Sequence, residues 1–216
     1  MEPAIRQAPR RHSKLRLFVF KAAESVMRAL GGRRLYRWWN LAPGRFDLRQ
    51  EQVTLPAEAR ALDGLVIVQL SDIHAGPFLA TGDLRHVVEA VNALAPDLVV
   101  FTGDLISRVA DEAWLVLPDL AQIRARHGFF AVFGNHDYRH RREAEIAEAF
   151  GAKGIRFLRN ESVRPLGPDS PLVLLGVEDL EEAKHLDVSA PRISRWCSPT
   201  IRAVRSPCRV QPRGLC

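Results

Sequence analysis

Three short segments of the chain share one pattern: VIVQLSDIH (residues 66–74), LVVFTGD (98–104) and FFAVFGNHD (129–137) each run from apolar residues into a polar cluster. Short apolar runs of this kind are typical of buried β-strands. Between the three segments, apolar residues recur at helical spacing. The alternation of strand and helix predicts an α/β fold with a mainly parallel β-sheet covered by helices.

The same periodicity predicts where the elements begin and end. We expect strands at residues 66–70, 98–101, 129–133, 155–158 and 172–177, and helices at 84–94, 112–126 and 141–150. Pro96 should close the first helix, and Pro118 should kink the second or begin a new helix there. The Gly167-Pro168-Asp169 sequence predicts a turn between the last two strands.

The polar clusters follow one another at nearly regular intervals. Asp72 precedes Asp104 by 32 residues, and Asp104 precedes Asn135 by 31 residues, so each interval is about one strand and one helix. Successive strand–helix units deliver their carboxyl ends to the same edge of a parallel sheet, which is where ligands bind. Gly103 and Gly134 allow sharp turns at the strand ends. Carboxylates, imidazoles and an amide at one edge predict a site for divalent metal ions.

These clusters resemble the signature of the calcineurin-like metallophosphoesterase family, which is D-x-H, then G-D, then G-N-H-D at successive strand ends. The matching residues here are 72–74, 103–104 and 134–137, and the extended D-x-x-x-x-T-G-D form spans 97–104. The resemblance covers roughly residues 65–180. The run Gly176-Val177-Glu178-Asp179 and the basic amino terminus look like the bacterial membrane-associated branch, some members of which cleave phospholipids or lipid A precursor diphosphates.

The resemblance implies a role for each matching residue. Asp72 and His74 would bind one metal ion, Asp104 would bridge both ions, and Asn135 would bind the second. His136 would act as the catalytic residue beside the phosphate, where it would stabilise the transition state or protonate the leaving oxygen. The cofactors would be two divalent ions such as Mn, Fe or Zn, about 3.5 to 4 Å apart.

The implied activity is metal-dependent hydrolysis of phosphate monoesters, diesters or diphosphates, with a substrate that could be lipid-linked. Asp137 is expected to orient a histidine from outside the ligand set. Structural roles are expected for the histidines and aspartates without a motif around them, which are His86, His127, His140, His185, Asp83, Asp97 and Asp119.

The net charge of +6 divides the 216 residues into three parts. Residues 1–46 hold eleven Lys or Arg and two acidic residues, residues 47–190 hold fourteen and twenty-three, and residues 191–216 hold six Arg and no acidic residue. We therefore expect a basic amino-terminal segment (1–46), a phosphoesterase domain (47–190) and a basic tail (191–216). Because the globular part is acidic, no specific binding of nucleic acid is expected.

Residues 10–45 combine basic residues with apolar residues at helical spacing and end in Trp38 and Trp39. Such a basic amphipathic helix is typical of segments that lie on an anionic membrane surface. A solvated helix and a disordered arm are the alternatives, and Arg10-Arg11 as a twin-arginine export signal is the least favoured. The expected location is the cytoplasm or the cytoplasmic face of the membrane.

Residues 192–216 are rich in Arg, Ser, Pro and Cys and show neither strand nor helix periodicity. The family pattern continues with further histidine ligands, including G-H-x-H, but His185 is the last histidine here. We expect an irregular tail and hypothesise that the reading frame changes near Ile193, which the nucleotide sequence would test. The alternatives to an active enzyme are an inactive remnant or metal-binding scaffold, and a basic adaptor acting through residues 1–46.

Overall fold

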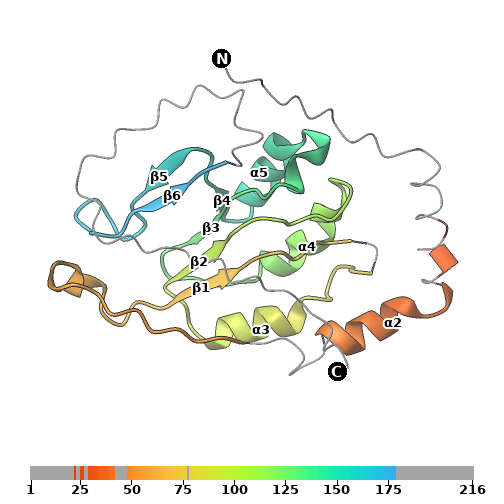
Figure 1. The fold of residues 1–216 in the computed structure, drawn as a ribbon, viewed down its shortest axis with the longest axis horizontal. Helices are drawn as coiled ribbons and strands as arrows, with labels where there is room; N and C mark the ends of the chain where they lie inside the picture. Colours follow the sequence, from red (N-terminus) through yellow and green to blue (C-terminus); the bar gives the residue numbers. More distant parts are fainter. Residues whose placement is uncertain (1–21, 23–24, 27–28, 42–47, 77, 179–216) are drawn as a thin grey trace, which may run out of the picture.

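The computed structural model describes residues 22, 25–26, 29–41, 48–76 and 78–178, and its core is one parallel sheet (Figure 1). Four strands lie in the order β1-β2-β3-β4. They are β1 (Ile67–Leu70), β2 (Leu98–Phe101), β3 (Phe129–Ala131) and β4 (Ile155–Phe157). Ile67 pairs with Leu98, and every neighbouring pair of these strands is parallel. The predicted α/β class with a mainly parallel sheet is confirmed.

One face of the sheet carries the main hydrophobic core. It includes Val99 and Phe101 of β2 and the alternate residues of β3 and β4. The helices α3 (Arg85–Ala93), α4 (Glu112–Leu120) and α5 (Glu143–Gly151) supply the residues that pack on this face. Alternate residues of a strand point to opposite faces, which explains why Val99 and Phe101 lie here and Leu98 does not.

The opposite face is covered by shorter elements. Leu98 packs with Ala59 and Leu62 of the 3₁₀ helix η2 (Ala57–Leu62) and with Leu172. On the same face Ile67 is 38% exposed, because β1 is an edge strand. In the described part of the chain, therefore, helices cover one face of the sheet and the 3₁₀ helix and a loop cover part of the other.

Most predicted elements differ from the structure by one or two residues at an end, and the second helix differs by more. The helix predicted at 112–126 ends at Leu120, two residues after Pro118. The proline has no N–H to donate, and the following segment bonds instead to Asn92 of α3, which accepts the amide of Arg124 and donates to the carbonyl of Gln122. The strand predicted at 172–177 is the shorter β6 (Leu174–Gly176).

Strand β6 lies outside the parallel sheet. It pairs antiparallel with β5 (Glu161–Val163), a strand that the sequence pattern did not predict. Figure 1 shows this hairpin beyond β4. Along β6 and the residues next to its ends, Val173, Leu175 and Val177 alternate with other residues and are 44–50% exposed. The described residues therefore leave this apolar stripe uncovered.

The predicted amphipathic helix at 10–45 lies largely outside the described residues, as do His185, all three cysteines and the irregular tail. Within it, α2 (Gly32–Tyr36) continues into the π-helix η1 (Arg37–Leu41). Among the described residues, no helix is both long enough and apolar enough to cross a bilayer.

Asp119 joins α4 to the start of α3. Its carboxylate is 2% exposed and accepts the backbone amides of Gly82, at 2.9 Å, and Leu84, at 3.1 Å. Leu84 is the N-cap of α3 and provides no side-chain cap, so Asp119 supplies the acceptor that the helix end needs. The structural role predicted for Asp119 is confirmed.

We expect Asp119→Ala to lower the free energy of unfolding by about 2–3 kcal/mol, because the amides of Gly82 and Leu84 lose a charged acceptor. Urea denaturation would measure the change, with Asp63→Ala as the control at an exposed aspartate. Equal stability of the two variants would contradict the capping role.

Candidate metal centre

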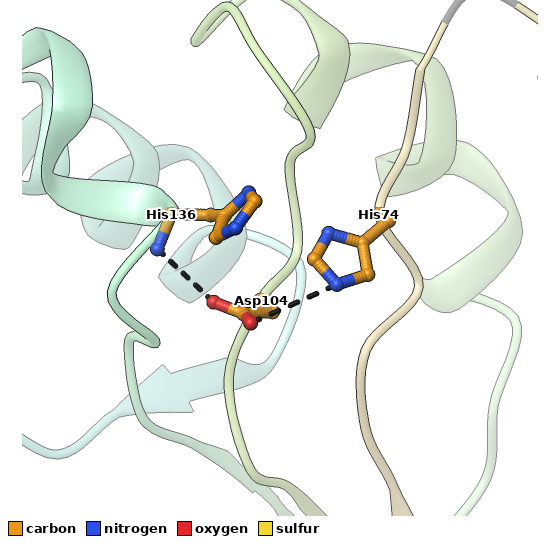
Figure 2. A group of neighbouring side chains, drawn as sticks. All are labelled: His74, Asp104 and His136. Atoms are coloured by element: carbon orange, nitrogen blue, oxygen red, sulfur yellow. Dashed lines mark hydrogen bonds and ion pairs between the residues drawn. The ribbon is translucent and has the colours of Figure 1, made fainter. Parts of the chain in front are cut away.

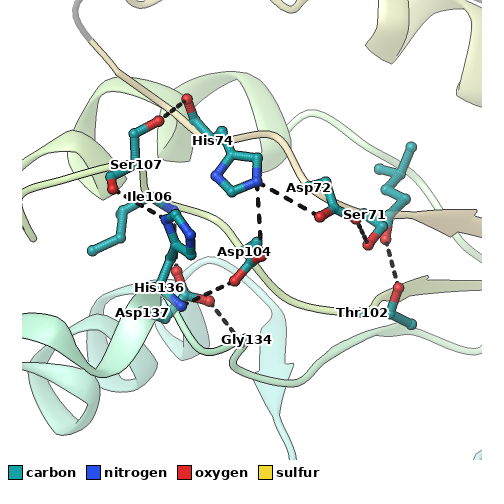
Figure 3. A network of polar contacts seen from close by, with 11 residues as sticks. Ser71, Asp72, His74, Thr102, Asp104, Ile106, Ser107, Gly134, His136 and Asp137 are labelled. Carbon is teal, nitrogen blue, oxygen red and sulfur yellow. Dashed lines mark hydrogen bonds and ion pairs between the residues drawn. The ribbon is translucent and has the colours of Figure 1, made fainter. Parts of the chain in front are cut away.

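The polar clusters lie together at the carboxyl ends of the first three strands (Figure 3). Asp72 and His74 follow β1, and Asp104 follows β2. His136 follows β3 and precedes the short helix η3 (Asp137–His140). The topology thus places the predicted site residues at one edge of the sheet, because parallel strands deliver their carboxyl ends to the same side.

Gly103 and Gly134 let two of these strand ends approach each other closely. A Cβ on Gly103 would lie 2.7 Å from the Cα of Gly134, and a Cβ on Gly134 would lie 2.3 Å from both the backbone nitrogen and Oδ1 of Asp104. Gly103 also has φ of +100°, which other residues adopt only at a cost. The two glycines therefore allow the Asp104 carboxylate to lie against the backbone of the Gly134 turn.

Three site residues have left-handed backbone conformations, with φ of 53° at Asp72, 45° at His74 and 60° at Asp104. Hydrogen bonds between the loops hold this shape: the Asp72 amide donates to Gly103 O, and the His74 amide donates to Asp104 O, both at 3.0 Å. Asp and His tolerate this region better than most residues but still favour other conformations. Backbone strain of this kind gathers at functional sites.

The side chains of His74, Asp104 and His136 converge (Figure 2). Their metal-binding atoms all lie within 4.8 Å of one another. His74 Nε2 is 3.7 Å from Asp104 Oδ2 and 3.6 Å from Asp72 Oδ1, so Asp72 belongs to the same group. The His74 and His136 rings meet edge to face, with their centroids 4.7 Å apart.

These separations fit ligands around a shared ion. Direct hydrogen bonds between imidazolium and carboxylate are about 2.7–2.9 Å long, which is shorter than either His74 contact. Two ligands bound tetrahedrally at about 2.1 Å from one ion are about 3.4 Å apart, close to what His74 shows. Two carboxylates and the His74 imidazole are also donors that suit a divalent transition metal, and the His136 ring lies beside them. The described residues therefore fit a metal ion.

Hydrogen bonds fix the His136 ring and the loop that carries His74. His136 Nδ1 lies 3.1 Å from the carbonyl oxygen of Ser107, so Nδ1 carries a proton and the lone pair of the neutral ring is on Nε2. The Ser107 hydroxyl donates to the carbonyl of His74 at 2.7 Å. The amide of His136 donates to Asp104 Oδ1 at 3.0 Å. Ser107 thus links the two histidine loops, and the sequence pattern gave no signal for it.

Asp137 is 1% exposed and accepts backbone amides rather than a histidine ring. Its two oxygens bond Ile106 N at 3.0 Å and Gly134 N at 2.9 Å. Burial raises the pKa of Asp137, while hydrogen bonds from Gly134, Ile106 and Leu105 oppose the rise. Asp137 therefore holds the β2 and β3 turns together, which positions Asp104 and His136 through the main chain.

Asn135 lies between Gly134 and His136 with an exposed side chain. The contacts that join the other four residues do not include it, and no side-chain hydrogen bond joins it to another residue of the described chain. The structure thus brings Asp72, His74, Asp104 and His136 together and leaves Asn135 at the rim of the group.

A sequence model of calcineurin-like phosphoesterases matches residues 65–192, more than half of the chain and all of the cluster. The chain belongs to the calcineurin-like phosphoesterase family. Among its relatives is a transmembrane protein with metallophosphoesterase domain from Danio rerio, 34% identical over 60% of this chain and 31% of that protein.

Two bacterial members of the family are also similar. The UDP-2,3-diacylglucosamine pyrophosphatase LpxG of Chlamydia muridarum is 35% identical over 56% of this chain and 38% of that protein. An uncharacterized metallophosphoesterase of Bacillus subtilis, YkuE, is 29% identical over 73% of this chain and 56% of that protein. The chain therefore spans between about a third and just over half of the length of these relatives.

Proposed function

We propose that this phosphoesterase domain hydrolyses phosphate monoesters, diesters or diphosphates with two divalent metal ions. The observation that supports this most is the position of the Asp104 carboxylate, whose Oδ2 is 3.7 Å from His74 Nε2 and whose Oδ1 accepts the amide of His136. A carboxylate between the loop that carries His74 and the loop that carries His136 can reach an ion on either side of it. Membership of the family supports the same reaction class.

Each ligand has a place in this proposal. Asp72 and His74 would hold the first ion, Asp104 would bind both, and Asn135 would turn its amide oxygen to the second. When bound, divalent ions of this kind act as Lewis acids at phosphate oxygens and lower the pKa of a bound water. The exposed position of Asn135 leaves its amide accessible from the open edge of the sheet.

His136 would act on the substrate. Its Nδ1 proton is engaged by the Ser107 carbonyl, which fixes the ring and directs its chemistry to Nε2. When Nε2 is protonated it can donate to a phosphate oxygen or to the leaving oxygen. The edge-to-face contact with the His74 ring places the His136 ring beside the proposed metal ligands.

A lipid-linked diphosphate is the substrate class that we favour. The relative LpxG is named for a pyrophosphatase activity on a diacylated sugar nucleotide. The basic, aromatic amino-terminal segment of this chain would suit a substrate that resides in a membrane.

Hydrolysis of bis-p-nitrophenyl phosphate by the full chain tests the reaction class. We expect release of nitrophenol that requires Mn²⁺ and stops when a chelator is added. Activity that is unchanged by the chelator would argue against metal-dependent hydrolysis.

The second candidate is a metal-binding scaffold without activity, for which the observation is that Asn135 is exposed and lies outside the group formed by the other site residues. Mn²⁺ should raise the midpoint of thermal unfolding under either proposal, because binding to the folded state at a hundredfold excess over Kd adds about 2.7 kcal/mol. A thermal shift without hydrolysis would identify the scaffold. No shift with Mn²⁺, Zn²⁺ or Fe²⁺ would contradict both.

A further inference from the structure

The helical segment formed by α2 and η1 exposes large apolar side chains. Leu35 is 63% exposed, Trp38 55% and Trp39 46%. Residues three and four positions apart share one side of a helix, so these three form a single face, which we call the Trp38 face. The two indole rings lie 5.8 Å apart at an angle of 61°.

The opposite side of the same segment packs against the rest of the domain. Tyr36 and Leu41 pack against the main hydrophobic core. The Tyr36 ring stacks on Phe78, with centroids 5.7 Å apart and an interplanar angle of 25°. Burial raises the pKa of the Tyr36 hydroxyl. Because Phe78 is four residues beyond His74, the segment is fixed to the loop that carries the first two metal ligands.

The sequence that contains this face is basic. Arg34 is exposed on the same segment, and residues 1–46 hold eleven Lys or Arg and two acidic residues. Indole rings in a basic segment suit the boundary between lipid headgroups and acyl chains, where the ring is buried and its N–H stays hydrated. Each nearby basic residue adds attraction to an anionic lipid surface.

The size of the face disfavours a second copy of the chain as its occupant. Because these side chains are 46–63% exposed, complete burial of one leucine and two indoles would remove about 300 Å² from water. A stable protein–protein interface buries about 800 Å² on each partner. Insertion of a few aromatic and aliphatic side chains is enough for reversible attachment to a bilayer when basic residues assist.

We propose that the Trp38 face docks on an anionic lipid bilayer. The Tyr36–Phe78 stack then keeps the Asp72–His74 loop next to the attached segment, so the metal centre works close to the membrane surface. Docking on a bilayer deepens the proposed function and rests on it, because a lipid-linked substrate would be found at the membrane. Attachment itself needs neither metal ions nor hydrolysis.

Sedimentation of the full chain with vesicles tests the proposal. One set of vesicles is phosphatidylcholine alone, and the other is an equimolar mixture with phosphatidylglycerol. We expect binding to the mixed vesicles, and we expect the double variant Trp38→Ser, Trp39→Ser to weaken it about tenfold or more. The matched control is Leu175→Ser, Val177→Ser, which removes two similarly exposed apolar side chains from β6 and the residue that follows it, and which should leave binding unchanged.

Three outcomes would overturn the proposal. The first is no binding of the unaltered chain to mixed vesicles, and the second is equal loss of binding in the Trp and β6 variants. The third is a fall in molar mass by light scattering when the two tryptophans are replaced, because it would show that a second copy occupies the face. Since no substrate is present, failure of hydrolysis does not affect this test.

Brominated lipids give a second measurement. In a Trp114→Phe, Trp196→Phe variant the emission comes from Trp38 and Trp39, and we expect the lipid bromines to quench it. A Trp38→Phe, Trp39→Phe, Trp196→Phe variant keeps an aromatic face but emits only from Trp114 of α4, which should not be quenched. Quenching of Trp114 alone would overturn the proposed orientation.

Discussion

The Asp104→Asn variant should bind Mn²⁺ at least about tenfold more weakly and hydrolyse bis-p-nitrophenyl phosphate at least about a hundredfold more slowly than the unaltered chain. Both effects are expected because the variant loses the negative charge of the Asp104 carboxylate, which lies between His74 and the proposed position of the second metal ion. Asparagine keeps an oxygen that can accept the His136 amide, which Asp104 Oδ1 now accepts at 3.0 Å. The fold should therefore survive the change, and calorimetry and a rate assay would measure its effect.

Asp169→Asn is the matched control, because Asp169 is exposed and lies in the turn before β6. It should bind the metal and hydrolyse the ester like the unaltered chain. If Asp104→Asn did the same, the carboxylate would not be a ligand and the proposed centre would be wrong. If Asp104→Asn lost metal binding while the unaltered chain bound Mn²⁺ but hydrolysed nothing, the scaffold would be the better description.

A methyl group at Gly103 should be strongly destabilising. The left-handed φ of +100° costs alanine about 1–3 kcal/mol, and the contact of 2.7 Å with the Gly134 backbone adds about 1–3 kcal/mol of overpacking. We expect Gly103→Ala to lower the free energy of unfolding by about 4 kcal/mol, measured by urea denaturation. That is a large share of the stability of an ordinary domain, about 5–15 kcal/mol.

Gly151→Ala provides the control, because a Cβ there meets nothing within 4 Å and the residue ends α5. Alanine favours a helix, so this variant should be as stable as the unaltered chain or slightly more stable. Should Gly103→Ala prove too unstable to purify, circular dichroism of Gly134→Ala gives a second reading, since its Cβ would lie 2.3 Å from the Asp104 nitrogen. Normal stability of both glycine variants would contradict the close approach of the two turns.

The parallel sheet and the position of its polar clusters were predictable because each strand is a short apolar run that ends in a turn. The bounds of β2, Leu98–Phe101, agree with the sequence pattern, and those of β1 differ by one residue. The antiparallel β5–β6 pair was missed since Glu161-Ser162-Val163 is too short and too polar to stand out. The early end of α4 was missed because Asn92 competes for its last turn, a contact between distant segments.

The candidate site residues were predictable from motif spacing and their proposed ligand roles from the family resemblance. The contacts that hold these residues in place were not predictable. Ser107 and the amide contacts of Asp137 depend on how two turns pack, which no periodicity records. Asp137 was expected to orient a histidine and instead accepts amides of Ile106 and Gly134. The Tyr36–Phe78 stack likewise joins residues that no local pattern relates.

The left-handed conformations of Asp72, His74 and Asp104 bear on the choice between enzyme and remnant. Glycine at any of these positions would relieve about 1 kcal/mol of conformational cost. The three side chains therefore lie at positions where the backbone alone would favour glycine. A cost to stability of this kind is typical of residues held in place for binding or catalysis.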